Sequence, residues 1–200
     1  EVRAHPDVKR MVDDWDTRAM WLDTVGQQLP TYRVDSVVLP QALTTLGDID
    51  WQVIHTPGHA TGGVSYLWEQ EGVLVSGDAL WEDGFGILNP WSDGDHVFAD
   101  AADALNRIDD ASPRIVIPGH GRAFHNVPAA LSRARSRLDY YARRPDRLQV
   151  QMVRSSLGFL RLSRPDLAES QMPAIALGMA RWLKLGEDDA ARVVSEIFNG

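Results

Sequence analysis

The chain has 200 residues, of which 44% are hydrophobic and 24% are charged, and its formal net charge is −8 at pH 7. One substantial core or two small ones can form at this length, and the composition excludes a fibrous or disordered chain. The negative charge disfavours binding to nucleic-acid phosphates and anionic lipids, so we expect neither nucleic acid nor a membrane as a partner. Because the chain has no cysteine, any metal must be held by His, Asp or Glu.

The N-terminal region begins with a helical pattern and continues with β-like runs. From Pro6 to Leu29 the apolar residues recur at helical spacing, which predicts a one-sided surface helix that Pro30 ends. Turn residues then separate four short β-like runs, at residues 34–39, 51–55, 63–68 and 72–76.

The second half of the chain changes from a mixed pattern to a helical one. An amphipathic helix is predicted after Asp95, and it leads into an apolar strand at residues 115–117. Strand, helix and strand in this order indicate an α/β layered domain. Asn126 is a plausible helix N-cap, and the β signals disappear after it, leaving helical stripes within residues 131–142, 150–160 and 190–198. We therefore predict an α/β domain at residues 1–126 and an all-helical domain at residues 127–200.

Three side chains stand where strands are predicted to end. His59 and His120 each close a Pro-Gly-His turn after an apolar strand, and Asp78 follows another strand beside Gly77. A single histidine near such a turn is usually structural, but the combination is much less often accidental. Imidazole and carboxylate groups presented by separate strand ends are what a zinc ion requires, and they also suit iron or manganese. The sequence therefore predicts a metal site at one edge of the sheet.

The segments around these residues resemble three metal motifs of the metallo-β-lactamase superfamily, and more closely those of its glyoxalase II-like and thioesterase-like members. The segments are residues 56–63 (TPGHATGG), 76–80 (SGDAL) and 118–121 (PGHG). The resemblance implies a four-layer αβ/βα sandwich, followed here by a helical region similar to a winged-helix-like C-terminal domain. It also implies that His59 completes a three-histidine zinc site, Asp78 bridges two metal ions and acts in catalysis, and His120 binds the second ion.

The chain departs from this family in one respect: the His-x-His-x-Asp-His motif, which supplies four ligands, does not occur in it. We therefore expect the chain to represent the C-terminal part of such an enzyme and to be inactive or nearly so by itself. The chain also opens with Glu1 instead of Met, so we expect its natural start to be missing. A half-exposed sheet would then favour a homodimer or a retained N-terminal fragment. We expect the protein to be cytoplasmic.

A glycine-rich loop after Asp78 carries Trp81, Phe85 and Ile87, which could bind the apolar part of a substrate or pack under the C-terminal helices. The resemblance implies a hydrolase of a small-molecule thioester, lactone or related ester that uses a metal-bound hydroxide. The alternative function is a non-catalytic scaffold or interaction domain with the same fold. A Ser-His-Asp hydrolase is set aside, because no Gly-x-Ser-x-Gly segment occurs.

Overall fold

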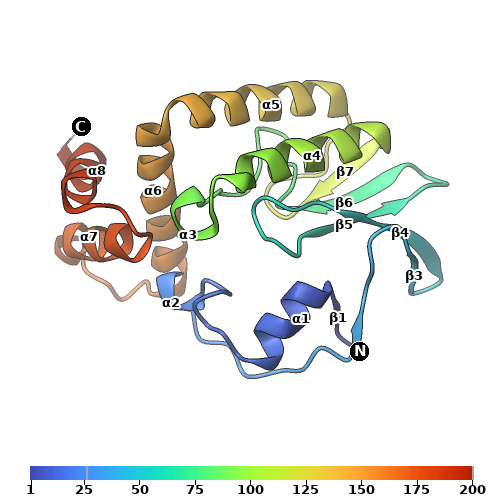
Figure 1. Ribbon diagram of the computed structural model, residues 1–200, viewed down its shortest axis with the longest axis horizontal. Helices are drawn as coiled ribbons and strands as arrows, with labels where there is room; N and C mark the ends of the chain where they lie inside the picture. The colour runs from blue at the N-terminus through green and yellow to red at the C-terminus, as the bar shows by residue number, and fades with distance from the viewer. Residues whose placement is uncertain (26, 200) are drawn as a thin grey trace.

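A five-stranded sheet forms the centre of the protein in the computed structural model, which describes residues 1–25 and 27–199 (Figure 1). Its strands, in their order across the sheet, are β3 (Leu43–Leu46), β4 (Ile49–His55), β5 (Val64–Trp68), β6 (Val73–Gly77) and β7 (Ile115–Pro118). Pairing is antiparallel from β3 to β6 and parallel between β6 and β7. The strands β4, β6 and β7 therefore run in one direction, and their C-terminal ends meet at one edge.

Two helices cover one face of this sheet. Helices α4 (His96–Asp110) and α5 (Val127–Arg143) lie together on the same side (Figure 1). The strand residues that face them, including Leu67, Leu74 and Val116, are buried in the main apolar cluster. Alternation along the strands thus directs one set of side chains to the helices, and the predicted α/β class is confirmed.

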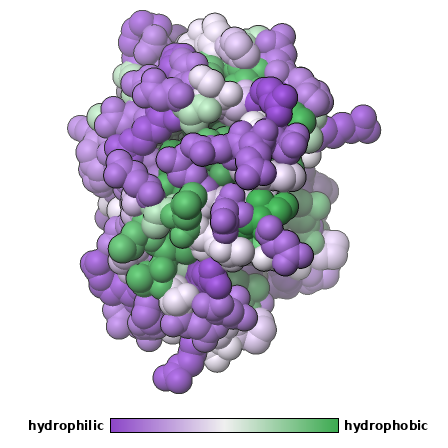
Figure 2. Space-filling view, turned by 90° about the vertical axis from the view of Figure 1, so that its right-hand side faces the viewer, coloured by the Kyte–Doolittle hydropathy of each residue, from purple (hydrophilic) through white to green (hydrophobic). Residues whose placement is uncertain are grey.

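The opposite face of the sheet is only partly covered. Tyr66, Val75 and Ile117 pair across three strands on this face, and Ile117 is 43% exposed. Apolar side chains are also visible among hydrophilic ones at the end of the molecule that carries β3 (Figure 2), where Leu43 and Leu46 are exposed. A homodimer or a retained N-terminal fragment stays a prediction for this surface.

The region after Asn126 is helical, as predicted. The Asn126 side chain accepts a hydrogen bond of 3.4 Å from the backbone N–H of Ala129, so it caps α5. The elements that follow are α6 (Pro145–Ser163), a short 3₁₀ helix (Glu169–Gln171), α7 (Met172–Trp182), which was not predicted, and α8 (Glu187–Asn199). One buried cluster runs from the sheet into α8. The division after residue 126 and the winged-helix likeness stay predictions.

The single helix predicted at residues 6–29 is wrong. The structure has α1 (Pro6–Asp13) and α2 (Leu22–Val25), and residue 26 lies outside the described residues. The Asp16 carboxylate accepts hydrogen bonds from the backbone N–H groups of Arg18 and Ala19, and this local bonding competes with a continuous helix. The short parallel strands β1 (Arg3–Ala4) and β2 (Ser36–Val37) flank this segment, and a further helix, α3, spans Pro90–Asp93.

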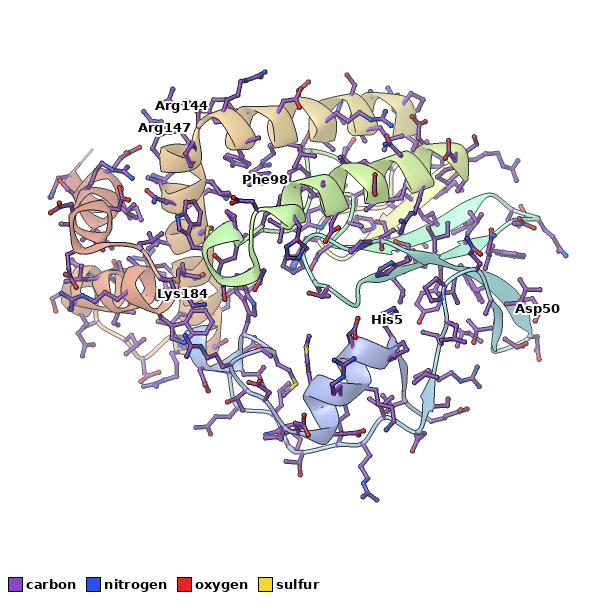
Figure 3. All side chains as sticks on the ribbon, viewed as in Figure 1. His5, Asp50, Phe98, Arg144, Arg147 and Lys184 are labelled. Carbon is purple, nitrogen blue, oxygen red and sulfur yellow. The ribbon has the colours of Figure 1, made fainter. Side chains whose placement is uncertain are left out.

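A stacked histidine pair joins α1 to the sheet. His5 precedes α1 and lies at its end nearest the sheet (Figure 3), and its ring stacks on His55 with centroids 4.9 Å apart and planes 2° from parallel. Burial lowers the pKa of His5, and the neighbouring His55 lowers it further.

Across the described residues, no helix has both the length and the apolar character needed to cross a membrane.

Candidate metal centre

The three predicted side chains meet at the edge where β4, β6 and β7 end. Asp78 directly follows β6, while His59 and His120 follow β4 and β7 through their Pro-Gly turns. Nε2 of His59 lies 3.5 Å from Oδ2 of Asp78, and Nε2 of His120 lies 3.8 Å from Oδ1 of the same carboxylate. The Asp78 carboxylate therefore lies between the two imidazoles, with one oxygen facing each ring.

The orientation of the His59 ring is set by a backbone carbonyl. Nδ1 of His59 lies 2.7 Å from the carbonyl oxygen of Ile87, and because a carbonyl can only accept, Nδ1 must be the donor. In the neutral imidazole, Nε2 then carries a lone pair that faces the Asp78 carboxylate. Two electron-rich groups so placed can share a cation, and a carbonyl on the other ring nitrogen is the usual support of a metal-binding histidine.

Two glycines allow the strand-end side chains to approach this closely. A Cβ atom at Gly86 would lie 2.6 Å from Cγ of His59 and 2.8 Å from Cβ of Asp78, and one at Gly119 would lie 2.6 Å from Oδ1 of Asp78. These separations are shorter than van der Waals contact. The backbone at both positions therefore forms part of the wall of the site.

A loop packed against α5 completes one side of the site. The Nε1–H group of Trp81 donates a hydrogen bond of 3.0 Å to Oδ1 of Asp78, and the Trp81 ring meets His120 edge-on with centroids 5.1 Å apart. The loop carbonyls of Glu82 and Asp83 accept hydrogen bonds from two α5 side chains, Arg133 and Arg137. These two arginines thus hold the loop that carries Trp81.

The strand ends and the C-terminal helices line a pocket of about 90 Å³. Trp81, Phe85 and Ile87 all line it, together with His59, Asp78 and His120, so the structure brings the predicted residues together. Phe85 and Ile87 also pack with the main apolar cluster, so each of these two residues serves both as core and as pocket wall. Their role in substrate binding stays a prediction.

Helices α5 and α6 add pocket residues that the sequence analysis did not single out. They include Arg137, Gln151, Ser155 and Phe159. The Phe159 ring lies 5.6 Å, centroid to centroid, from that of His120. The helical spacing of Leu148, Gln151, Ser155 and Phe159 places them on one face of α6, a signal that could have been found in the sequence. Only the tertiary packing places that face against the strand ends.

An acidic residue lines the wider cleft that leads to the same strand ends. Asp93, the last residue of α3, lines this cleft with His59, Asp78 and His120. Burial raises the pKa of the Asp93 carboxyl, an effect that a hydrogen bond from Ser92 and nearby positive charges only partly offset. The sequence analysis did not single out this residue.

The donor set suits a divalent metal ion, although it is not a complete one. Two imidazoles and a carboxylate are typical ligands of zinc, iron and manganese, and the Ile87 carbonyl and the Gly86 and Gly119 backbones fit such a site. Within residues 1–25 and 27–199, however, no three His, Asp or Glu side chains are grouped closely enough to hold an ion by themselves. His59, Asp78 and His120 would therefore bind a metal together with water or further donors.

The α/β fold and the three strand-end side chains agree with one protein superfamily. A model of the metallo-beta-lactamase superfamily matches residues 2–120, and the chain belongs to that superfamily. It is 30% identical over 102 residues to a hydroxyacylglutathione hydrolase from Francisella tularensis subsp. novicida (strain U112), an alignment that covers 50% of this chain and 39% of that protein.

Two further proteins are similar to this chain, one a curated protein and the other a protein of known structure. The chain is 31% identical over 88 residues to the probable metallo-hydrolase YqjP of Bacillus subtilis (strain 168), which covers 42% of this chain and 28% of that protein. A metallo-beta-lactamase family protein from Thermus thermophilus superposes with a TM-score of 0.56 at 18% identity, covering 76% of this chain and 56% of that one. The chain thus spans well under half the length of the curated relatives it matches.

Proposed function

We propose that this protein is a metal-dependent hydrolase of a small-molecule thioester, lactone or related ester. The observation that carries the proposal is the position of His59 Nε2, 3.5 Å from the Asp78 carboxylate, on a ring that the Ile87 carbonyl orients through Nδ1. A divalent ion bound there would lower the pKa of a coordinated water and polarise the carbonyl to be attacked. The name of the Francisella relative, hydroxyacylglutathione hydrolase, supports the choice of a thioester.

The residues of this chain have separate roles in the proposal. His59 and His120 would hold the ion together with Asp78, which presents one carboxylate oxygen toward each histidine. Phe85 and Ile87 form an apolar wall that receives the acyl part of the substrate and excludes water from it. Zinc is the ion we propose, with iron or manganese as the alternatives that the same ligands would accept.

The first test is metal binding, measured by competition with a chelator for the chain loaded with zinc, iron or manganese. We expect His59→Ala, Asp78→Ala and His120→Ala each to weaken binding at least about tenfold. His125→Ala is the matched control, because His125 is exposed and is not one of the pocket residues. Tight binding of two ions by this chain would contradict the expectation that its ligand set is incomplete.

The second test is hydrolysis of matched thioester, lactone and β-lactam panels by the metal-loaded protein. We expect thioesters to be the best substrates, with a low rate as long as the ligand set is incomplete. Since the chain alone is expected to be nearly inactive, metal binding discriminates between the two functions: a parent chain that binds no more metal than the His59→Ala variant would favour the non-catalytic scaffold.

A further inference from the structure

We propose that the cleft beside the metal centre binds a long hydrocarbon chain, so that the substrate is a long-chain acyl thioester or ester. This inference rests on the proposed function, which it deepens by naming the class of acyl group. The cleft has a volume of about 690 Å³, within the usual range of small-molecule sites, about 300–1,000 Å³. The pocket beside Phe85 has only about 90 Å³, so the room for a substrate lies in the cleft.

Apolar side chains from two parts of the chain line this cleft. The N-terminal segment contributes Met11, Met20, Trp21, Leu22, Leu29 and Tyr32. Ile87 and the α6 residue Phe159 belong to the same lining. Leu29 and Tyr32 remain 48% and 43% exposed. Large apolar side chains gathered around a concave surface mark a site for an apolar ligand, since leaving them in water is unfavourable.

The N-terminal side of the cleft is fixed to the C-terminal helices. Helix α2 packs against α6 (Figure 1), and Trp21, directly before α2, meets Trp182 of α7 edge-on with ring centroids 5.9 Å apart. The Arg18 guanidinium lies over the same Trp182 ring, 5.9 Å from its centroid. These contacts preform the cleft, which limits the entropy that is lost when a ligand binds.

The cleft is continuous with the metal centre. His59, Asp78 and His120 line both the cleft and the smaller pocket, and so do Ile87 and Phe159. A chain attached to a carbonyl group at the metal centre can therefore pass along Ile87 and Phe159 into the cleft. This continuity is the reason to assign the hydrocarbon chain to the substrate.

The charged groups favour an uncharged chain. Among the described residues, the charged side chains that line the cleft outside the metal centre are Asp16 and Arg18, which are exposed, and Asp93. Burial raises the pKa of the Asp93 carboxyl, so these surroundings already disfavour one negative charge and would disfavour a second more strongly. Met11 and Met20 are unbranched and flexible, which suits them to a chain of variable conformation.

The test measures binding, so that it does not depend on turnover. The probes are alkyl methyl sulfoxides with butyl, hexyl, octyl and decyl chains, because the S=O group imitates the substrate carbonyl and cannot be hydrolysed. Dissociation constants for the full chain are measured by NMR titration below the micellar concentration of each probe. We expect binding to tighten about tenfold for each two added methylene groups until the cleft is filled, the usual effect of burying them.

Variants then locate the binding. Met11→Gln and Met20→Gln keep the side-chain length but make the wall polar, so each should weaken the decyl probe about three- to tenfold, the butyl probe much less, and metal binding not at all. Both methionines are half-buried and lie outside the main apolar cluster, so both variants should fold, as thermal midpoints will show. Matched controls are Leu43→Gln and Leu162→Gln, which change exposed residues outside the cleft and should change no constant.

Three results would overturn the inference. The first is a set of dissociation constants that do not fall with chain length, including no measurable binding. The second is a chain-length dependence that both methionine variants leave unchanged. The third is a dimer of the parent chain that Met20→Gln converts to a monomer, because the cleft would then be an interface between copies.

The metal-binding and thioester assays separate this inference from the proposed function. Binding that depends on chain length, in a chain that binds no metal, would leave the cleft assignment standing while the proposed hydrolysis fails. Hydrolysis of thioesters without any preference for long acyl chains would do the reverse.

Discussion

Trp81 donates its indole N–H to Oδ1 of Asp78 over 3.0 Å while its ring contacts His120. One side chain thus supports two of the three metal-site residues. Since Trp81 belongs to a loop that α5 arginines hold by its carbonyls, the geometry of the metal centre is tied to the helical part of the chain. Supporting contacts of this kind orient ligands and adjust metal affinity.

Replacing Trp81 by Phe should weaken metal binding about 10- to 100-fold, because the ring contact remains but the hydrogen bond to Asp78 is lost. The free energy of unfolding should fall by only about 0.5–1.5 kcal/mol. Chelator competition and chemical denaturation measure the two quantities. Trp68→Phe, on a strand tryptophan that packs against Trp51, is the matched control, and equal metal affinity in Trp81→Phe and the control would refute the role of the hydrogen bond.

Arg137→Met should loosen the Trp81 loop without unfolding α5. The variant keeps most of the side-chain stem but loses the hydrogen bonds to the Asp83 carbonyl and the Tyr141 hydroxyl. We expect amide hydrogen exchange in residues 81–85 to accelerate about tenfold, the effect of roughly 1.4 kcal/mol. Arg135→Met removes an arginine of the same helix that pairs instead with Asp109, so exchange in the loop should not change there.

Replacing glycine by alanine should have opposite effects on the free energy of unfolding at the metal site and on the surface of α6. Gly86→Ala would place a methyl group against His59 and Asp78, so we expect weaker metal binding and a loss of about 1–3 kcal/mol in the free energy of unfolding. Gly158→Ala lies within α6 with no atom within 4 Å of the added Cβ. It should stabilise the protein by about 0.5–1 kcal/mol. Thermal melts compare the two, and a stabilised Gly86→Ala variant would contradict the packing argument.

Asp93→Asn should stabilise the protein at neutral pH. Burial raises the pKa of this carboxyl above its ordinary value of 3.8, so the folded state holds the proton to a higher pH than the unfolded chain does. The stabilising effect of that proton is complete below pH 3.8 and is lost as the pH rises through the raised pKa. Asn stays neutral, so its advantage should grow between about pH 4 and pH 7.

The pH dependence of Asp93 can be checked by thermal midpoints across that interval. Asp95→Asn, which changes an exposed residue next to the same helix, serves as the control. If Asp93→Asn and Asp95→Asn shift the midpoint equally at every pH, the raised pKa does not contribute to stability.

Local patterns in the sequence were sufficient for several features. The apolar runs at residues 51–55, 63–68 and 72–76 predicted β4, β5 and β6 to within a few residues, since alternation and turn chemistry act between near neighbours. His59, Asp78 and His120 were also predicted from neighbouring residues, because the Pro-Gly-His turns and the Gly77-Asp78 pair mark the ends of apolar strands. The helix predicted at residues 6–29 failed, because the turn bonded by Asp16 interrupts a continuous periodic pattern.

Residue types and local backbone preferences therefore determined where strands end and which side chains stand at those ends. Only the tertiary structure decided that the Ile87 carbonyl orients His59, that Trp81 bonds Asp78, and that α6 brings Gln151 and Ser155 into the same pocket. These contacts join segments brought together by strand order and helix packing. Both depend on interactions between residues distant in the chain, for which a single sequence carries no local pattern.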